Sequence, residues 1–118
     1  MSKNIVVVQP KADVEAGGIR ALVDKSTGSD NFSFQHAIFP TTRTSAKGIV
    51  YNGYDEGGYV IRGKCEISSG GKTEIVGPGG FFFVPDGVPY DFKVVEAPLE
   101  VIAVFSPPLP SDYFDQSH

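Results

Sequence analysis

The sequence predicts an all-β protein folded as a small antiparallel β-barrel or jelly roll. Short apolar runs recur along the 118 residues, and clusters of Gly, Pro, Asp and Asn separate them. This alternation of short strands and turns is typical of barrels and sandwiches. The 14 Gly and 9 Pro residues suit a chain with many tight turns. No stretch carries the apolar period of a helix of normal length.

The length of the chain favours one domain over residues 1–118. Within it we expect a barrel core at about residues 19–105, an N-terminal strand at 4–9 and a Pro-rich tail at 106–118. Pro cannot donate a ladder hydrogen bond, so the tail cannot continue a strand.

Charge and cysteine content narrow the range of partners. The net charge is −4 and no basic stripe is present, so nucleic acid is not an expected partner. The apolar run Ile5–Val8 is too short for a signal or a membrane span. We therefore expect a cytoplasmic protein that does not act at a membrane. Cys65 is the single cysteine and cannot form an intrachain disulfide.

Apolar runs and turn residues locate the individual strands. Residues 24–31 and 40–47 are polar and irregular and predict loops, and the Gly-Gly pair at 70–71 predicts a hairpin turn. A strand through Glu56 is expected to lose regular pairing near Ile61, before a turn at Gly63. The other expected strands are 4–9, 19–23, 32–39, 48–52, 64–68, 73–76, 81–84, 90–95 and 99–105.

The strand at 32–39 carries a candidate functional histidine. Alternation puts Phe32, Phe34, His36 and Ile38 on one face. Three apolar neighbours predict that this face lines the barrel. His36 is then either a core residue bonded to the backbone or a member of a site.

The segment around the last turn before residue 90 has a specific spacing. Gly79, five residues, Pro85, one residue and Gly87 place turn residues on both sides of an apolar strand at 81–84. Gly tolerates positive φ and Pro fixes φ, so this spacing prescribes corners.

This spacing resembles the second motif of the cupins, which are small β-barrels. In that motif two residues separate the last Gly from a metal-binding His, and this chain has Tyr90 at the position of the His. The first cupin motif has His-x-His, three residues, Glu, six residues and Gly. Glu56 and Gly63 fit its Glu and Gly, and the two His positions fall on Val50 and Asn52. The segment also resembles the cupins of ethanolamine-utilisation operons.

The resemblance implies a metal site that this chain has largely lost. A typical cupin holds a divalent metal with three His and one Glu. Val50 offers no lone pair, Asn52 offers a weak carbonyl, and the phenol of Tyr90 is normally protonated. We therefore predict no cofactor. A divalent transition metal held by His36, Glu56, Asn52 and Tyr90 is the alternative.

The expected site is the mouth of the barrel, with Glu56, Tyr90 and His36 as catalytic residues. Burial would raise the pKa of Glu56 and make it a general acid or base, and Tyr90 could donate to a developing oxyanion. An apolar cavity with a few polar groups is typical of a small-molecule site. The residues expected to contact the substrate are Asn52, Val50, Phe34, Phe92 and Cys65.

These residues favour metal-independent proton transfer on a small carbonyl compound, as in an isomerase, cyclase, lyase or decarboxylase. A non-catalytic cupin that binds a ligand or partner is the alternative, and Glu56 and Tyr90 would then have structural roles. The resemblance also implies a homodimer, because cupins often lend an N-terminal strand such as residues 4–9 to a neighbour's sheet.

Overall fold

The computed structural model describes residues 5–9 and 17–115. The predictions for Asn4 and for the end of the tail at 116–118 lie outside these residues. The elements, in chain order, are β1 (Gly18–Val23), the 3-10 helix η2 (Lys25–Thr27), β2 (Ser33–Phe39), β3 (Ser45–Ile49), β4 (Asp55–Ser69), β5 (Lys72–Val76), β6 (Phe81–Val84), β7 (Tyr90–Ser106) and the 3-10 helix η3 (Tyr113–Asp115).

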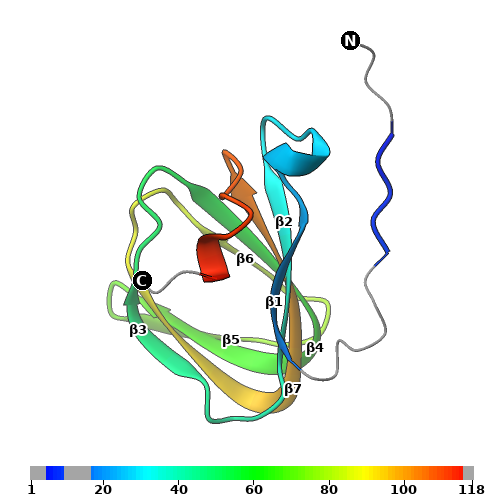
Figure 1. The fold of residues 1–118 in the computed structure, drawn as a ribbon. Helices are drawn as coiled ribbons and strands as arrows, with labels where there is room; N and C mark the ends of the chain where they lie inside the picture. The colour runs from blue at the N-terminus through cyan, green and yellow to red at the C-terminus, as the bar shows by residue number, and fades with distance from the viewer. Residues whose placement is uncertain (1–4, 10–16, 116–118) are drawn as a thin grey trace.

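The predicted antiparallel barrel is confirmed. The strands are hydrogen-bonded in the order β1-β2-β7-β4-β5, with β3 added on β7 and β6 on β4. Each of the two long strands, β4 and β7, pairs with the other and with two further strands. Because both curve strongly, the sheet closes around an interior (Figure 1). All paired strands in the described part of the chain are antiparallel, as in a jelly roll.

The face of β2 that lines the barrel is the opposite of the predicted one. Gln35 and Ala37 pair with Ala103 and Val101 of β7 and point inward. His36 therefore points to the outer face. The prediction was wrong because apolar residues lie on both faces of β2, so apolar content alone does not identify the inner one.

Strand β4 runs further than expected. It continues to Ser69, and the pairing with β7 shifts between Val60 and Arg62 and again before Cys65. The first shift is a bulge that brings Arg62 opposite Glu100 on the outer face, so the charge of Arg62 stays outside the barrel. Gly63 has φ +79°, and a Cβ there would lie 2.3 Å from the carbonyl oxygen of Pro98.

Strand β3 begins and ends earlier than the predicted strand at 48–52. It covers residues 45–49, so part of the expected loop at 40–47 is a strand. Its small residues Ser45 and Ala46 pair with Lys93 and Phe92 of β7. The pairing comes from a neighbour distant in sequence, and the polar local composition gave no sign of it.

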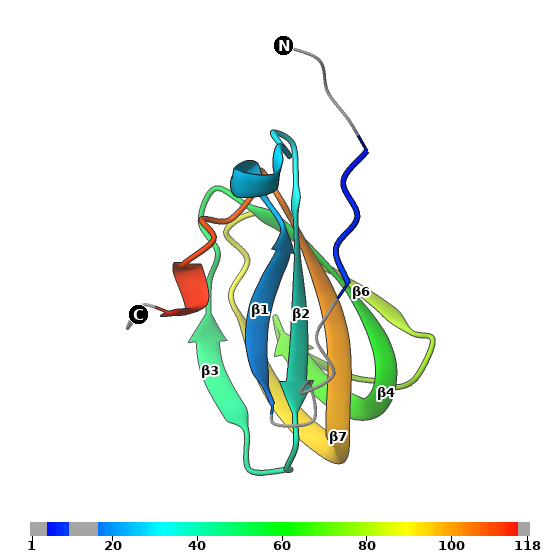
Figure 2. The ribbon, with the colours of Figure 1, turned by 45° about the vertical axis from the view of Figure 1, so that its right-hand side comes forward.

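The segment after β7 folds back over one end of the barrel. Leu109 is 1% exposed, and its backbone N–H donates to Oγ of Ser33 at 3.0 Å. η3 lies at this end of the barrel (Figures 1 and 2). Its Phe114 lines the cavity, with its ring centroid 6.5 Å from that of Phe105. Residues 5–9 run beside the barrel and pair with no described strand. None of the described helices is long and apolar enough to span a membrane.

Candidate active site

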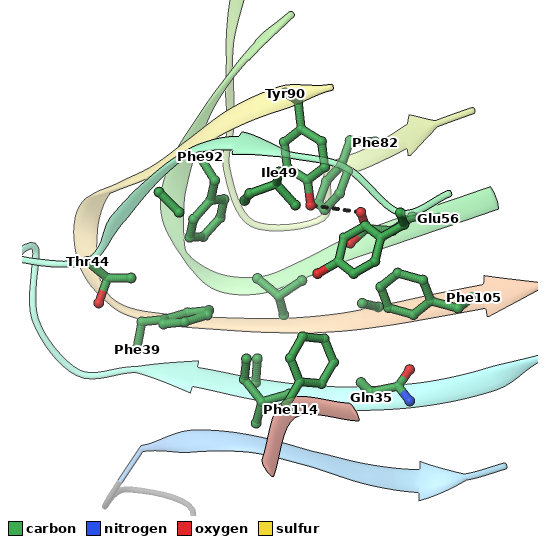
Figure 3. A pocket seen from close by; sticks show the side chains of 16 residues that line it. Gln35, Phe39, Thr44, Ile49, Glu56, Phe82, Tyr90, Phe92, Phe105 and Phe114 are labelled. Atoms are coloured by element: carbon green, nitrogen blue, oxygen red, sulfur yellow. Dashed lines mark hydrogen bonds between the residues drawn. The ribbon is translucent and has the colours of Figure 1, made fainter. Parts of the chain in front are cut away.

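The barrel contains a cavity of about 250 Å³ with mainly aromatic and aliphatic walls (Figure 3). Gly58 makes room for part of this wall, since a Cβ there would lie 2.0 Å from the ring of Phe82. The lining residues are Ile19, Gln35, Ala37, Phe39, Thr44, Ala46, Ile49, Tyr51, Glu56, Phe82, Tyr90, Phe92, Val101, Ala103, Phe105 and Phe114.

Glu56 and Tyr90 form a buried hydrogen-bonded pair on this wall. The hydroxyl of Tyr90 donates to Oε1 of Glu56 at 2.8 Å (Figure 3). Glu56 lies near the start of β4, where it pairs with Val84 on one side and Phe105 on the other. Tyr90 is the first residue of β7 and pairs with Ile49 of β3. Four strands thus fix the geometry of the pair.

Burial changes the acidity of both groups. It raises the pKa of Glu56 to about 7, although the hydrogen bond from Tyr90 lowers the pKa. The pKa of Tyr90 is raised by burial and by the nearby Glu56 carboxylate. Glu56 can therefore exchange a proton near neutral pH, while the phenol of Tyr90 keeps its proton and acts as a donor.

Tyr51 is a third member of this polar cluster, and sequence reasoning missed it. Burial and the charge of Glu56 raise the pKa of Tyr51, and a hydrogen bond with Tyr90 lowers it. The Tyr51 ring packs edge-on against Phe105 with centroids 4.8 Å apart. Its position directly before the Asn52-Gly53 turn was the available signal, because strand ends at a barrel mouth commonly carry site residues.

Val50 and Asn52 do not line the cavity, contrary to prediction. Both are exposed, and Ile49 and Tyr51 face inward instead. The prediction took Val50 and Asn52 from the His-x-His positions of the first cupin motif, which assumes an unbroken strand alternation from Val50 through residues 52–54 to Glu56. Those residues form a turn, with Gly53 at φ +90° and the N–H of Tyr54 donating to the carbonyl of Tyr51. A turn breaks the two-residue period, so the inward positions shift by one.

Two other predicted contact residues also lie elsewhere. Phe34 points outward from β2 with His36. Cys65 is fully buried in the core cluster with Val60, Val94 and Leu99, where burial raises the pKa of its thiol to about 11. Cys65 therefore has neither access to the cavity nor a reactive thiolate.

Phe92 does line the cavity as predicted. Of the expected site residues, the structure brings together Glu56, Tyr90 and Phe92.

His36 belongs to a separate polar cluster on the outer face of the sheet. Its Nε2 lies 2.7 Å from Oε2 of Glu100, and Nε of Arg62 donates to Oε1 of Glu100 at 2.9 Å. The pair of His36 and Glu100 joins β2 to β7, and Arg62 joins β4 to the same carboxylate. This arrangement gives His36 a structural role and removes it from the cavity.

The donors around the cavity do not fit a tightly held transition metal. Ile49, Tyr51, Glu56 and Tyr90 occupy the inward positions near the two cupin-like motifs. Only Glu56 is a carboxylate, it already accepts a hydrogen bond, and no imidazole is present among them. Within residues 5–9 and 17–115, no three His, Cys, Asp or Glu side chains are grouped to hold a metal ion.

The cupin domain family matches residues 47–105, which is half of the chain. The chain therefore belongs to the cupin family.

A match to an uncharacterised protein of Streptomyces coelicolor has 39% identity over 54 residues, 46% of this chain. The matched part spans about half, 51%, of that curated relative.

Several solved structures share the fold. Ectoine synthase from P. lautus has 23% identity and a TM-score of 0.73, over 96% of this chain and 85% of its own. An RmlC-like cupin from Methanocaldococcus jannaschii with a double-stranded β-helix fold has 18% identity and a TM-score of 0.71, over 90% and 94%. The EutQ protein of Clostridium difficile has 20% identity and a TM-score of 0.67, over 87% and 75%. At such identities these similarities show the fold alone.

Proposed function

We propose that this cupin is a small-molecule enzyme that transfers protons by metal-independent acid/base chemistry on a small carbonyl compound in the barrel cavity. The observation that supports this most directly is the buried pair of Glu56 and Tyr90, 2.8 Å apart on the cavity wall. A carboxyl group with a pKa of about 7 is suited to both taking and returning a proton near neutral pH.

In the proposed reaction Glu56 removes a proton from the carbon next to the carbonyl group. The electron pair of that C–H bond moves to the carbonyl oxygen and forms an enolate, which hydrogen-bond donors in the cavity stabilise. Tyr90 and Tyr51 keep their protons because burial raises the pKa of both phenols. Return of the proton to another atom, or loss of a leaving group, would complete an isomerisation or elimination.

Hydrogen–deuterium exchange tests this proposal without knowledge of the natural substrate. Small ketones are incubated with the protein in D₂O, and deuterium entering at the α-carbon is followed by NMR. We expect Glu56→Gln to reduce protein-dependent exchange by roughly 100-fold or more, because it keeps shape but removes proton transfer. Glu100→Gln, which changes a carboxylate on the outer face, is the matched control. Equal exchange in wild type and Glu56→Gln would refute the acid/base role.

A non-catalytic ligand-binding cupin is the second candidate function. The aromatic walls of the cavity favour it as much as they favour catalysis. Saturable binding of a ketone with no exchange above the buffer rate would support this function over the enzyme.

We also propose that the protein forms a homodimer. Phe81 and Phe83 point outward from β6 and are 77% and 64% exposed, next to Tyr59 of β4. The apolar residues Ile5–Val8 are exposed and pair with no described strand of their own chain. A second copy could cover the outer face and offer a strand edge to residues 5–9.

A further inference from the structure

Gln35 is a buried amide on the cavity wall that the acid/base pair leaves unused. It is 2% exposed and lines the cavity. Gln35 pairs with Ala103 of β7, while Glu56 on β4 pairs with Phe105. The two side chains therefore lie on the same inner surface of the sheet, with β7 between their strands (Figure 3). Their partners on β7, Ala103 and Phe105, are successive residues of the inward face.

A directed chain of hydrogen bonds orients this amide. The backbone N–H of Leu109 donates to Oγ of Ser33 at 3.0 Å, and the Ser33 hydroxyl donates to Oε1 of Gln35 at 3.2 Å. A backbone N–H can only donate, so the Ser33 oxygen accepts there and its proton is directed to Gln35. The opposite orientation of the amide would leave that hydroxyl proton without an acceptor.

The amide nitrogen Nε2 of Gln35 has no hydrogen-bond partner in the described part of the chain. A buried donor without a partner is costly, and nearly all such groups in folded proteins are paired. Gln35 lines the barrel cavity and also a second hollow beside Arg20 and Asp24, and each is a space from which an acceptor can come. The barrel cavity is the one that also holds Glu56 and Tyr90. An oxygen atom of a bound ligand would satisfy the amide.

The charges around the cavity restrict the ligand further. None of the 16 described lining residues is Lys, Arg or His, and Glu56 is their sole carboxylate. A carboxylate or phosphate placed here would lose its hydration without gaining a cation. The aromatic walls instead favour an apolar body.

We propose that Nε2 of Gln35 binds the carbonyl oxygen of an uncharged, largely apolar small molecule, and that this contact selects neutral carbonyl compounds over anions. The inference rests on the proposed function in taking the barrel cavity as the ligand site. It adds the charge class of the substrate and the residue that recognises its oxygen.

Binding of four matched benzene derivatives tests the proposal. Acetophenone carries a neutral carbonyl, ethylbenzene has no acceptor, benzoate is an anion and benzylammonium is a cation. The Kd of each is measured by calorimetry or NMR titration for wild type and Gln35→Met. We expect acetophenone to lose about five- to tenfold in affinity relative to ethylbenzene in the variant, the value of one neutral hydrogen bond. Benzoate should bind neither protein.

A second variant and a direct signal protect the test against misfolding. Gln35→Glu keeps an oxygen that can accept from Ser33 but has no amide donor. Thermal unfolding of Gln35→Glu and Gln35→Met is compared with that of wild type, to check that both variants are folded. In wild type the side-chain amide signals of Gln35 should shift when acetophenone is added, while those of the exposed Gln9 should not. These readouts measure ligand recognition alone. Recognition by Gln35 can therefore be absent while α-carbon exchange by Glu56 is observed, and recognition can be observed while exchange is absent.

Several outcomes would overturn the assignment of Gln35. They are an unchanged affinity ratio in Gln35→Met, an unmoved Gln35 amide signal with acetophenone bound, and no binding of either neutral compound to wild type. Tighter binding of benzoate or benzylammonium than of acetophenone would refute the proposed charge class.

Discussion

The phenol of Tyr90 donates to the carboxyl group of Glu56 across 2.8 Å inside a closed β-barrel, and neither side chain has another charged group beside it on the cavity wall. Burial is the first cause of the raised pKa of Glu56. Ionised Glu56 is thus supported by a phenol donor but by no cation. The cost of ionising Glu56 in the folded state should therefore affect the free energy of unfolding as well as catalysis.

The stability of the protein should depend on pH through Glu56. Its pKa rises from 4.5 to about 7 on folding, so the folded state binds more protons between these values. The free energy of unfolding therefore falls as pH rises through this window and is restored on acidification. We expect Glu56→Gln to be more stable than wild type at pH 8, by up to roughly 3 kcal/mol, and equal to it near pH 4.5. Urea unfolding at both pH values measures this, and parallel pH profiles would contradict it.

Removing the phenol hydroxyl of Tyr90 should raise the pKa of Glu56 further. In Tyr90→Phe the carboxylate loses a donor that stabilises its charged form, while burial is unchanged. The ¹³C shift of the Glu56 side-chain carboxyl, followed by NMR from pH 4 to 9, should show a higher midpoint than in wild type. Phe114→Leu, a change on the same wall without a hydroxyl, is the control. A midpoint that moves downward would refute this role of Tyr90.

Local sequence patterns encode the strands and turns of this barrel, whereas the pairing of strands determines which face of each strand lines the cavity. Turn residues and apolar runs correctly predicted the barrel. The resemblance to the two cupin motifs selected Glu56 and Tyr90, which the structure places on one cavity with Phe92. The errors at Val50 and His36 have different causes. At Val50 a turn interrupts the strand period, and at His36 both faces of the strand carry apolar residues.

Contacts distant in sequence account for the residues that were missed. The importance of Gln35 depends on Ser33 and on a backbone N–H that arrives from Leu109. Tyr51 enters the site because the chain turns directly after it and places its ring against Phe105. The hydrogen-bond partners of Gln35 do not follow from residue spacing, because strand pairing and the return of the C-terminal segment create them. For Tyr51 the following turn is visible in the sequence, but its contact with Phe105 is not.

His36 should matter for stability and not for ligand chemistry. It lies on the outer face with Nε2 2.7 Å from Glu100. We expect His36→Asn to lower the free energy of unfolding by about 1–3 kcal/mol, since the partly buried Glu100 loses one of its hydrogen bonds and keeps the one from Arg62. Ketone affinity and exchange rate should stay within twofold of wild type. Loss of exchange in a folded His36→Asn protein would restore His36 to the site.

Metal affinity should depend on which residues near the β3–β4 turn face inward. Because the cavity donors do not suit a transition metal, we expect no stoichiometric Zn²⁺ binding by wild type in calorimetry after treatment with a chelator. Ile49→His, Tyr51→His and Tyr90→His together should create Zn²⁺ binding, because these positions line the cavity with Glu56.

The matched control is the triple variant Val50→His, Asn52→His and Tyr90→His. In it Ile49 and Tyr51 are unchanged. It should bind Zn²⁺ much more weakly, because residues 50 and 52 are exposed and outside the cavity. Stronger binding by this second variant would show that the inward register is misassigned. Tight binding by wild type would show that the donor set was judged wrongly.

The outer face of β4 and β6 should contribute to a homodimer interface. Phe81 packs against Tyr59 with ring centroids 4.7 Å apart, yet Phe81 remains 77% exposed. Large exposed aromatic residues on one sheet face are typical of an interface, and so are exposed apolar residues such as 5–8 that pair with no described strand. Light scattering at micromolar concentration should give the mass of a dimer. Phe81→Ser with Phe83→Ser, or deletion of residues 5–9, should shift it towards the monomer, because each removes one half of the proposed contact. Val50→Ser, an exposed apolar residue between β3 and β4, should leave the dimer intact. A wild-type monomer would refute the homodimer, and a dimer insensitive to both changes would place the interface on another face.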